Sequence, residues 1–125
     1  MKKEVKTSKA QSAPGLLSQA IITGNFIYTS GMIHLTPDGK LLSGTTAEKF
    51  KLVMNNLNEV LKAAGADFDD VVKVTIYVTD IAFVPVLNPI YKTYFREPFP
   101  AREAICIKAL PLGADIEISM VAVKN

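Results

Sequence analysis

The stretch that decides the fold is Pro100-Ala-Arg-Glu-Ala-Ile-Cys-Ile-Lys-Ala-Leu-Pro-Leu-Gly-Ala-Asp-Ile-Glu117. Its two apolar runs predict neighbouring strands at about 102–109 and 115–123, joined by a Leu-Pro-Leu-Gly turn. One guanidinium, Arg102, begins the first run, and one carboxylate, Glu117, lies within the second. Charges in an apolar sheet are costly unless they pair or bind a ligand. Spacing alone favours a salt bridge for each and leaves a ligand site as the alternative.

Outward from this stretch, hydrophobic periodicity predicts four further strands and two helices. The strands are expected at about 4–7, 18–22, 26–30 and 71–80, and the helices at about 45–64 and 83–95. Thr45-Thr46-Ala47-Glu48 is a capping-box pattern, and Asn56 is expected on the solvent side of the first helix. Two strand–helix–strand crossovers place both helices on one face of a mixed sheet. The chain is therefore predicted to be one α+β domain, residues 1–125.

The composition bounds what this domain can do. Of the 125 residues, 49% are hydrophobic, which together with the uncovered sheet face predicts a subunit interface. The net charge of +2 is too small to argue for nucleic acid or a membrane surface. The single cysteine, Cys106, excludes an intrachain disulfide and fits a reducing compartment. Without a signal core or an apolar run of about 18 residues, a cytoplasmic location is expected.

Strand parity assigns a direction to the candidate residues. Arg102, Ala104 and Cys106 alternate with Ile105 and Ile107, so the two isoleucines are expected to point into the helix-covered core. Arg102 is then expected on the uncovered face, which meets other subunits. A planar guanidinium suits bidentate capture of a carboxylate.

Five other residues are candidates for chemistry. Glu117 is suited to hold or deprotonate a water, and Ser30 with Gly31 can offer a hydroxyl and a close backbone N–H to an anion. Cys106 has no evident base beside it and is interpreted as a buried or interface hydrophobe. The lone His34 is interpreted as a surface or interface residue, and no metal site or cofactor is expected.

Pro100-Ala-Arg102 with Leu110-Pro111 and Glu117 resembles the signature of the RidA (YjgF, or L-PSP endoribonuclease) family. The likeness extends over almost the whole chain. The resemblance implies a chorismate-mutase-like α+β subunit in a homotrimer with pockets between neighbouring subunits. It also implies cofactor-free hydrolysis of reactive imines and enamines, such as 2-aminoacrylate, to 2-keto acids and ammonia.

The resemblance also implies roles for individual residues. Arg102 matches the arginine that grips the substrate carboxylate, and Glu117 matches the glutamate that positions the attacking water. Ser30, Gly31 and Asn88 match pocket-lining positions.

Several positions depart from the family pattern. Ala104 stands where many members have a cysteine whose backbone carbonyl helps to hold the water. Leu17 stands where a pocket tyrosine is common, Met32 replaces a usual glutamine, and Pro89 is unusual inside the second helix. Loss of the tyrosine hydroxyl makes the pocket more apolar, which bears on substrate choice.

Two other functions stay open at this point. One is a trimeric sensor that binds small carboxylic or 2-keto acids through Arg102 without turnover. The other is a ribonuclease or translation inhibitor, against which the nearly balanced charge and the lack of a basic groove argue.

Overall fold

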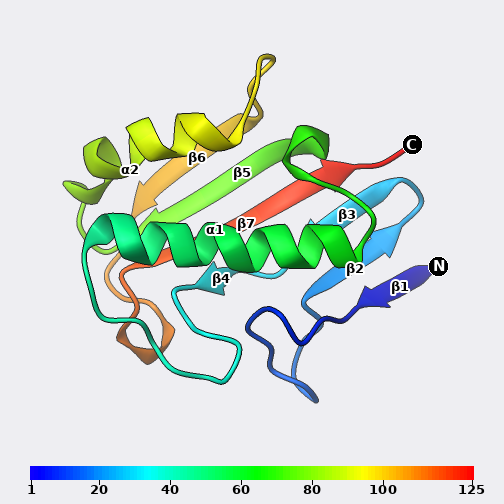
Figure 1. Cartoon of the computed structure of the whole chain (residues 1–125), viewed down its shortest axis with the longest axis horizontal. Helices are drawn as coiled ribbons and strands as arrows, with labels where there is room; N and C mark the ends of the chain where they lie inside the picture. Colours follow the sequence, from blue (N-terminus) through cyan, green and yellow to red (C-terminus); the bar gives the residue numbers. More distant parts are fainter.

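The computed structural model describes residues 1–125 and contains one seven-stranded sheet (Figure 1). The strand order is β1-β2-β3-β7-β5-β6, and the short β4 pairs with β7. Only β5 and β6 run parallel, and the other paired strands are antiparallel, so the sheet is mixed as predicted. The strands are β1 (Lys2–Val5), β2 (Ala20–Thr23), β3 (Phe26–Thr29), β4 (Met32–Ile33), β5 (Val71–Val78), β6 (Ala101–Cys106) and β7 (Ile116–Val123).

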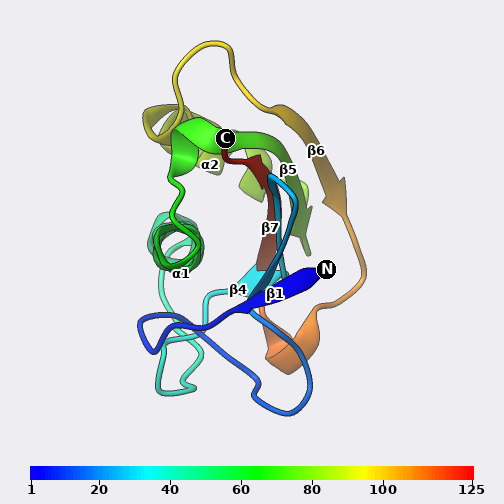
Figure 2. The same ribbon diagram turned by 90° about the vertical axis from the view of Figure 1, so that its right-hand side faces the viewer.

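Both helices pack on one face of the sheet, which confirms the predicted layering (Figure 2). Helix α1 (Thr46–Ala63) begins with the predicted capping box between Thr45 and Glu48. Helix α2 (Phe83–Tyr91) contains Pro89 and continues into a 3-10 turn, η2 (Lys92–Tyr94). Two further 3-10 turns, η1 (Phe68–Asp70) and η3 (Pro111–Gly113), precede β5 and β7.

The core lies between the helices and the sheet. Its α1 side is one apolar face of the helix, on which Phe50, Met54 and Leu57 have no exposed surface. The expectation that Asn56 faces solvent was wrong, because its side chain is fully buried. Its amide nitrogen donates to the carbonyl oxygens of Ile33 (3.3 Å) and Leu35 (2.9 Å), so α1 is tied to the segment around β4.

The expectation that β6 and β7 are neighbouring strands was also wrong. Strand β5 lies between them, parallel to β6 and antiparallel to β7. The β5–α2–β6 crossover places β6 at the edge of the sheet, and the chain then returns through η3 to insert β7 between β3 and β5. The apolar stretch that decides the fold therefore joins the edge of the sheet to its centre.

The second face of the sheet carries no helix (Figure 2). Phe26 and Tyr28 of β3 stack on this face with ring centroids 6.0 Å apart, and both are about half exposed. Ile105 of β6 is 40% exposed, although it is a large apolar residue within a strand. These exposed apolar side chains share the face with the Lys73–Glu103 ion pair, and apolar groups left uncovered on one face are typical of an interaction surface. None of the helices is both long enough and apolar enough to pass through a bilayer.

Candidate functional site

Arg102 lies on the helix-covered face, so the predicted direction of its side chain was wrong. It pairs in the β5–β6 ladder with Val74, and Ala104 pairs with Ile76. Both β5 partners are fully buried in the core, and Ala104 packs against the same core. Ile105 therefore points to the bare face. Parity failed because both faces of this edge strand carry apolar residues, so hydrophobicity could not tell them apart.

Residues of α2 surround the guanidinium of Arg102. An N–H of Arg102 donates to Oδ1 of Asn88 at 2.6 Å, and Cζ lies 4.7 Å from the centroid of the Tyr91 ring. With Lys92 and Phe99 these residues line a surface pocket of about 430 Å³, which contains no acidic side chain. We call these five residues the arginine half-site. One amide acceptor occupies one of five guanidinium donors, which leaves the cation able to bind an anion.

Glu117 belongs to the opposite, bare face. It pairs with Tyr77 in the β5–β7 ladder, whereas its neighbours Ile116 and Ile118 are fully buried in the core. Its carboxylate lies against Gly31, where an added Cβ would be only 2.5 Å from Oε2. Burial raises the pKa of Glu117 above its ordinary value of 4.5. A carboxylate without a counter-charge, with a raised pKa, is suited to accept a proton.

Ser30 lies next to Gly31 and is held by the preceding loop. Its hydroxyl donates to the carbonyl of Ser18 at 2.6 Å, and its backbone N–H donates to the carbonyl of Gln19 at 2.9 Å. Leu17, which precedes Ser18, is 45% exposed and lines a separate hollow of about 280 Å³ along β1. We call Ser30, Gly31 and Glu117 the glutamate half-site.

Six of the seven predicted site residues thus fall into two groups within one chain, and Leu17 lies apart from both. Arg102, Asn88 and Ala104 lie on or beside the helix-covered face, and Glu117 with Gly31 lies toward the bare face. Neither charge takes part in an ion pair within the chain, so the salt bridge that spacing favoured is absent.

The structure also bears on two other interpretations from the sequence. Cys106 is exposed in this chain, which excludes a position in its core and leaves an interface position as the prediction. His34 is not a surface residue, because only 1% of it is exposed. The chain contains no group of three or more His, Cys, Asp and Glu side chains that could hold a metal ion.

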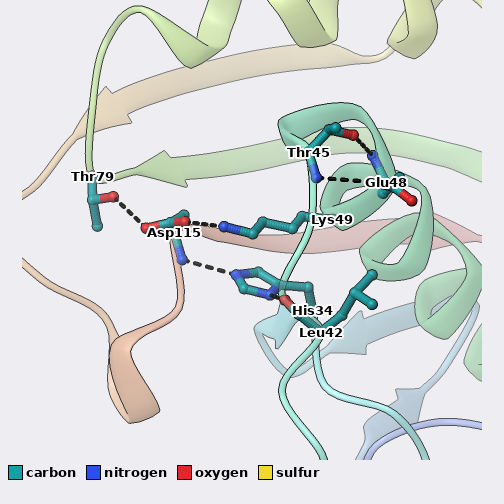
Figure 3. A network of polar contacts seen from close by, with 7 residues as sticks. All are labelled: His34, Leu42, Thr45, Glu48, Lys49, Thr79 and Asp115. Atoms are coloured by element: carbon teal, nitrogen blue, oxygen red, sulfur yellow. Dashed lines mark hydrogen bonds and ion pairs between the residues drawn. The ribbon is translucent and has the colours of Figure 1, made fainter.

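His34 instead connects the end of β4 to the start of β7 (Figure 3). Its Nδ1 donates to the carbonyl of Leu42 at 2.8 Å, and its Nε2 accepts from the backbone N–H of Asp115 at 2.9 Å. This pattern fits a neutral ring with the proton on Nδ1. Burial lowers the pKa of His34 below 6.5. Asp115 also forms an ion pair with Lys49 and accepts a hydrogen bond from Thr79 at 3.2 Å, and the Lys49 bond lowers its pKa.

Sequence reasoning missed three residues of the arginine half-site. No role in the site was assigned to Tyr91, Lys92 or Phe99. A signal for Tyr91 did exist, since it lies three residues after Asn88 and residues at that spacing share a helix face. Lys92 and Phe99 have no such signal, because the chain beyond α2 sets their position.

Known proteins resemble this chain over its full length. The model of the Endoribonuclease L-PSP family matches residues 7–124. A Rattus norvegicus protein named 2-iminobutanoate/2-iminopropanoate deaminase is 46% identical over 100% of this chain and 92% of its own. An Arabidopsis thaliana protein named Reactive Intermediate Deaminase A, chloroplastic, is 44% identical over 98% of this chain and 66% of its own.

Solved structures resemble this chain as well. Yeast Mmf1 has a TM-score of 0.96 at 33% identity, with 100% of both chains covered. RidA from an Antarctic Psychrobacter has a TM-score of 0.91 at 34% identity, with 97% of this chain and 98% of that chain covered. The mixed sheet with two helices on one face is thus the α+β fold of RidA structures. The chain belongs to the Endoribonuclease L-PSP family, the RidA/YjgF family that its sequence resembles.

Proposed function

We propose that this protein is a cofactor-free deaminase that hydrolyses reactive 2-imino acids and enamines, such as 2-aminoacrylate, to 2-keto acids and ammonia. The observation that carries the proposal is the guanidinium of Arg102, which lines a pocket without any acidic side chain and has no carboxylate partner in its own chain. The names of the deaminase relatives, at 42–46% identity in mammals, support the reaction class.

Arg102 binds the carboxylate of the substrate. An isolated guanidinium in a concave, partly desolvated site gains a strong charge-assisted pair when a carboxylate enters. Asn88 occupies one N–H and fixes the plane of the fork, so the remaining donors face the incoming acid in a defined direction. This anchor delivers the C=N carbon to one place, and positioning alone lowers the barrier for attack on an electrophilic imine.

Glu117 holds the water that attacks this carbon. As the oxygen–carbon bond forms, the π pair of the C=N bond moves to nitrogen, and the carboxylate takes a proton from the water. The same proton then passes to the amine nitrogen of the tetrahedral intermediate. Since the imine is attacked in its protonated form, the nitrogen is now an ammonium group. Glu117 takes the remaining proton of the hydroxyl as the oxygen forms the C=O bond of the keto acid, the carbon–nitrogen bond breaks, and ammonia leaves with the bonding pair. The raised pKa of Glu117 suits both directions of this transfer.

The two half-sites meet between subunits. Because Arg102 and Glu117 lie toward opposite faces of one sheet, a single ligand reaches both only where two copies are in contact. The bare apolar face provides a surface for that contact, and β6, which carries Arg102, is an edge strand. We infer a homotrimer in which the arginine half-site of one subunit faces the glutamate half-site of the next.

The test generates 2-aminoacrylate with a separate dehydratase and follows release of the keto acid. Wild type is expected to accelerate release, and Arg102→Ala is expected to lose about a hundredfold in kcat/KM because the carboxylate anchor is gone. Arg96→Ala is the matched control, since Arg96 pairs with Asp69 on the surface. If wild type and Arg102→Ala accelerate release equally, the proposal is wrong. Binding of 2-ketobutyrate without any effect on the rate points to a sensor instead.

A further inference from the structure

The guanidinium of Arg102 is held between two residues of α2 that lie one helical turn apart. Asn88 accepts a hydrogen bond from the edge of the guanidinium, and Tyr91 presents the face of its ring at 4.7 Å from Cζ. Asn88 and Tyr91 are at i and i+3, so both project from the same side of α2 toward β6. Two contacts of different kind therefore define the position of one cation.

The Tyr91 ring is itself firmly placed. Only 6% of the residue is exposed, and its ring centroid lies 4.8 Å from that of Phe95, which in turn packs at 5.6 Å against Phe68. A buried ring with aromatic neighbours has little rotamer freedom. The ring of Tyr91 is therefore held in one orientation against the guanidinium of Arg102.

The hydroxyl of Tyr91 does not explain this placement. Its oxygen is buried and has no hydrogen-bond partner in the chain, which is an unfavourable arrangement for a polar group. The feature that acts on Arg102 is instead the ring face, whose negative quadrupole attracts a cation within about 6 Å.

We infer that Tyr91 is a positioning residue that holds the guanidinium of Arg102 for the substrate carboxylate. The inference rests on the proposed role of Arg102 in carboxylate binding. The ring attracts the cation from one side, and Asn88 restrains one edge, so the free donors point into the 430 Å³ pocket. Tyr91 acts through Arg102 and does not touch the reacting atoms.

The sharpest test varies the ring's electrostatics without changing its size. Tyr91 is replaced by phenylalanine and then by phenylalanines with one, two and three fluorines, since each fluorine weakens the negative face of the ring. The dissociation constant of 2-ketobutyrate, measured by calorimetry, is expected to rise stepwise by about tenfold over the series. Fluorination at Phe95, which touches Tyr91 but has no contact with the guanidinium, is the matched control and is expected to leave binding unchanged.

A double-mutant cycle gives the second readout. Tyr91→Leu is expected to weaken 2-ketobutyrate binding and raise KM, with kcat changing much less, whereas Tyr91→Phe retains most of the affinity. In an Arg102→Ala background, Tyr91→Leu is expected to have no further effect on binding. An unchanged dissociation constant across the fluorine series, or an equal loss in both backgrounds, overturns the inference. If the protein does not hydrolyse imines but its dissociation constant for 2-ketobutyrate still rises along the fluorine series, the proposed function is refuted and the role of Tyr91 is not.

Discussion

Arg102 and Glu117 lie on opposite faces of one sheet, on strands that are separated by β5. Arg102 is in register with buried Val74, whereas Glu117 is in register with Tyr77 on the face without helices. No side-chain rotation brings the two charges to one small ligand through an intact sheet. A site that uses both must therefore take each from a different copy of the chain.

The first prediction is complementation between inactive variants. Arg102→Ala and Glu117→Ala are each expected to be inactive as homo-oligomers, but subunits of the two kinds assembled together can join an intact arginine half-site to an intact glutamate half-site. Every mixed trimer has one intact site of three, so about a third of wild-type activity is expected from oligomers that carry both variants. The measurement is 2-aminoacrylate hydrolysis by co-expressed, doubly tagged oligomers.

The control pairs Arg102→Ala with the double variant Arg102→Ala/Glu117→Ala. No site in that mixture has an intact arginine, so no activity is expected. If co-assembly of the two single variants also gives none, the site does not use both residues from different copies.

The second prediction concerns the bare face. Tyr28 is 46% exposed there and lies in register with Val121. Tyr28→Lys places a charge in the proposed contact, where it loses hydration without gaining a partner, so dissociation to monomers and loss of activity are expected together. Sedimentation at micromolar concentration measures the first effect. Lys51→Glu, on the exposed side of α1, is the control and should remain assembled. An active monomer of Tyr28→Lys would contradict the two-copy site.

How much of this arrangement the sequence could predict depends on the range of the interaction that sets each feature. Helix α1 was predicted to within a residue at each end because its signals are local: the Thr45–Glu48 capping box and Gly65, whose φ is +81°. The position of β7 between β3 and β5 depends on contacts far apart in the chain, and the local turn wrongly suggested a hairpin.

The candidate site divides in the same way. Arg102 and Glu117 could be chosen as candidates from charges within apolar runs and from the family resemblance. The sequence could not predict that the two residues lie on opposite faces of the sheet, because Ile105 on the bare face is as apolar as a core residue. The contacts of Asn88 and Tyr91 with Arg102 are tertiary contacts between α2 and β6. In the sequence, only the spacing of Asn88 and Tyr91 indicated them.

The third prediction is an acidic limb in the pH profile. Burial raises the pKa of Glu117 above 4.5, and the protonated carboxyl cannot accept a proton from water. The value of kcat, corrected for uncatalysed imine hydrolysis, is therefore expected to fall with decreasing pH, with a midpoint above 4.5. Glu117→Gln should lack this limb and lose about a hundredfold in kcat.

Stability supplies the control for that variant. A raised pKa in the folded chain means that the charged carboxylate opposes folding, and the contribution of Glu117 to stability is lost as the pH rises through that pKa. At pH 7 Glu117→Gln should thus be at least as stable as wild type despite its much lower kcat. A midpoint below 4.5, or the same limb in Glu117→Gln, would count against the assignment.

The fourth prediction uses the contact between Gly31 and Glu117. A Cβ at residue 31 would lie 2.5 Å from Oε2 of Glu117 and 2.7 Å from its carboxyl carbon, so Gly31→Ala must displace the carboxylate. A shift of about 1 Å in a positioned group can reduce the rate by about a hundredfold, and we expect a loss of that order in kcat. In a Glu117→Ala background the added methyl group has room, so Gly31→Ala should then cost little stability in thermal unfolding. Full activity of Gly31→Ala would show that the carboxylate position is not critical.

The last prediction concerns stability near neutral pH. His34 is buried, and its neutral ring donates to Leu42 and accepts from the backbone N–H of Asp115. Burial is the main cause that lowers its pKa, Lys49 adds to it, and Asp115 and the Leu42 bond oppose it. Because the unfolded chain binds the proton more readily, this contribution to the free energy of unfolding is full above pH 6.5 and decreases as the pH falls below 6.5. Protonation of Nε2 also places a ring N–H against the backbone N–H of Asp115, so that hydrogen bond is lost.

Urea unfolding at pH 7.5 and pH 5.5, at one fixed protein concentration, tests this linkage. Wild type is expected to lose stability between the two conditions. His34→Gln, which cannot titrate, should be weaker by about 1–3 kcal/mol at pH 7.5 through the lost buried hydrogen bonds, and its stability should change less between the two. The Lys49–Asp115 ion pair does not contribute to the difference, because the pKa of Asp115 is lowered below 3.8 and its carboxylate stays charged throughout. An identical pH dependence in both proteins would mean that His34 is not the group that titrates.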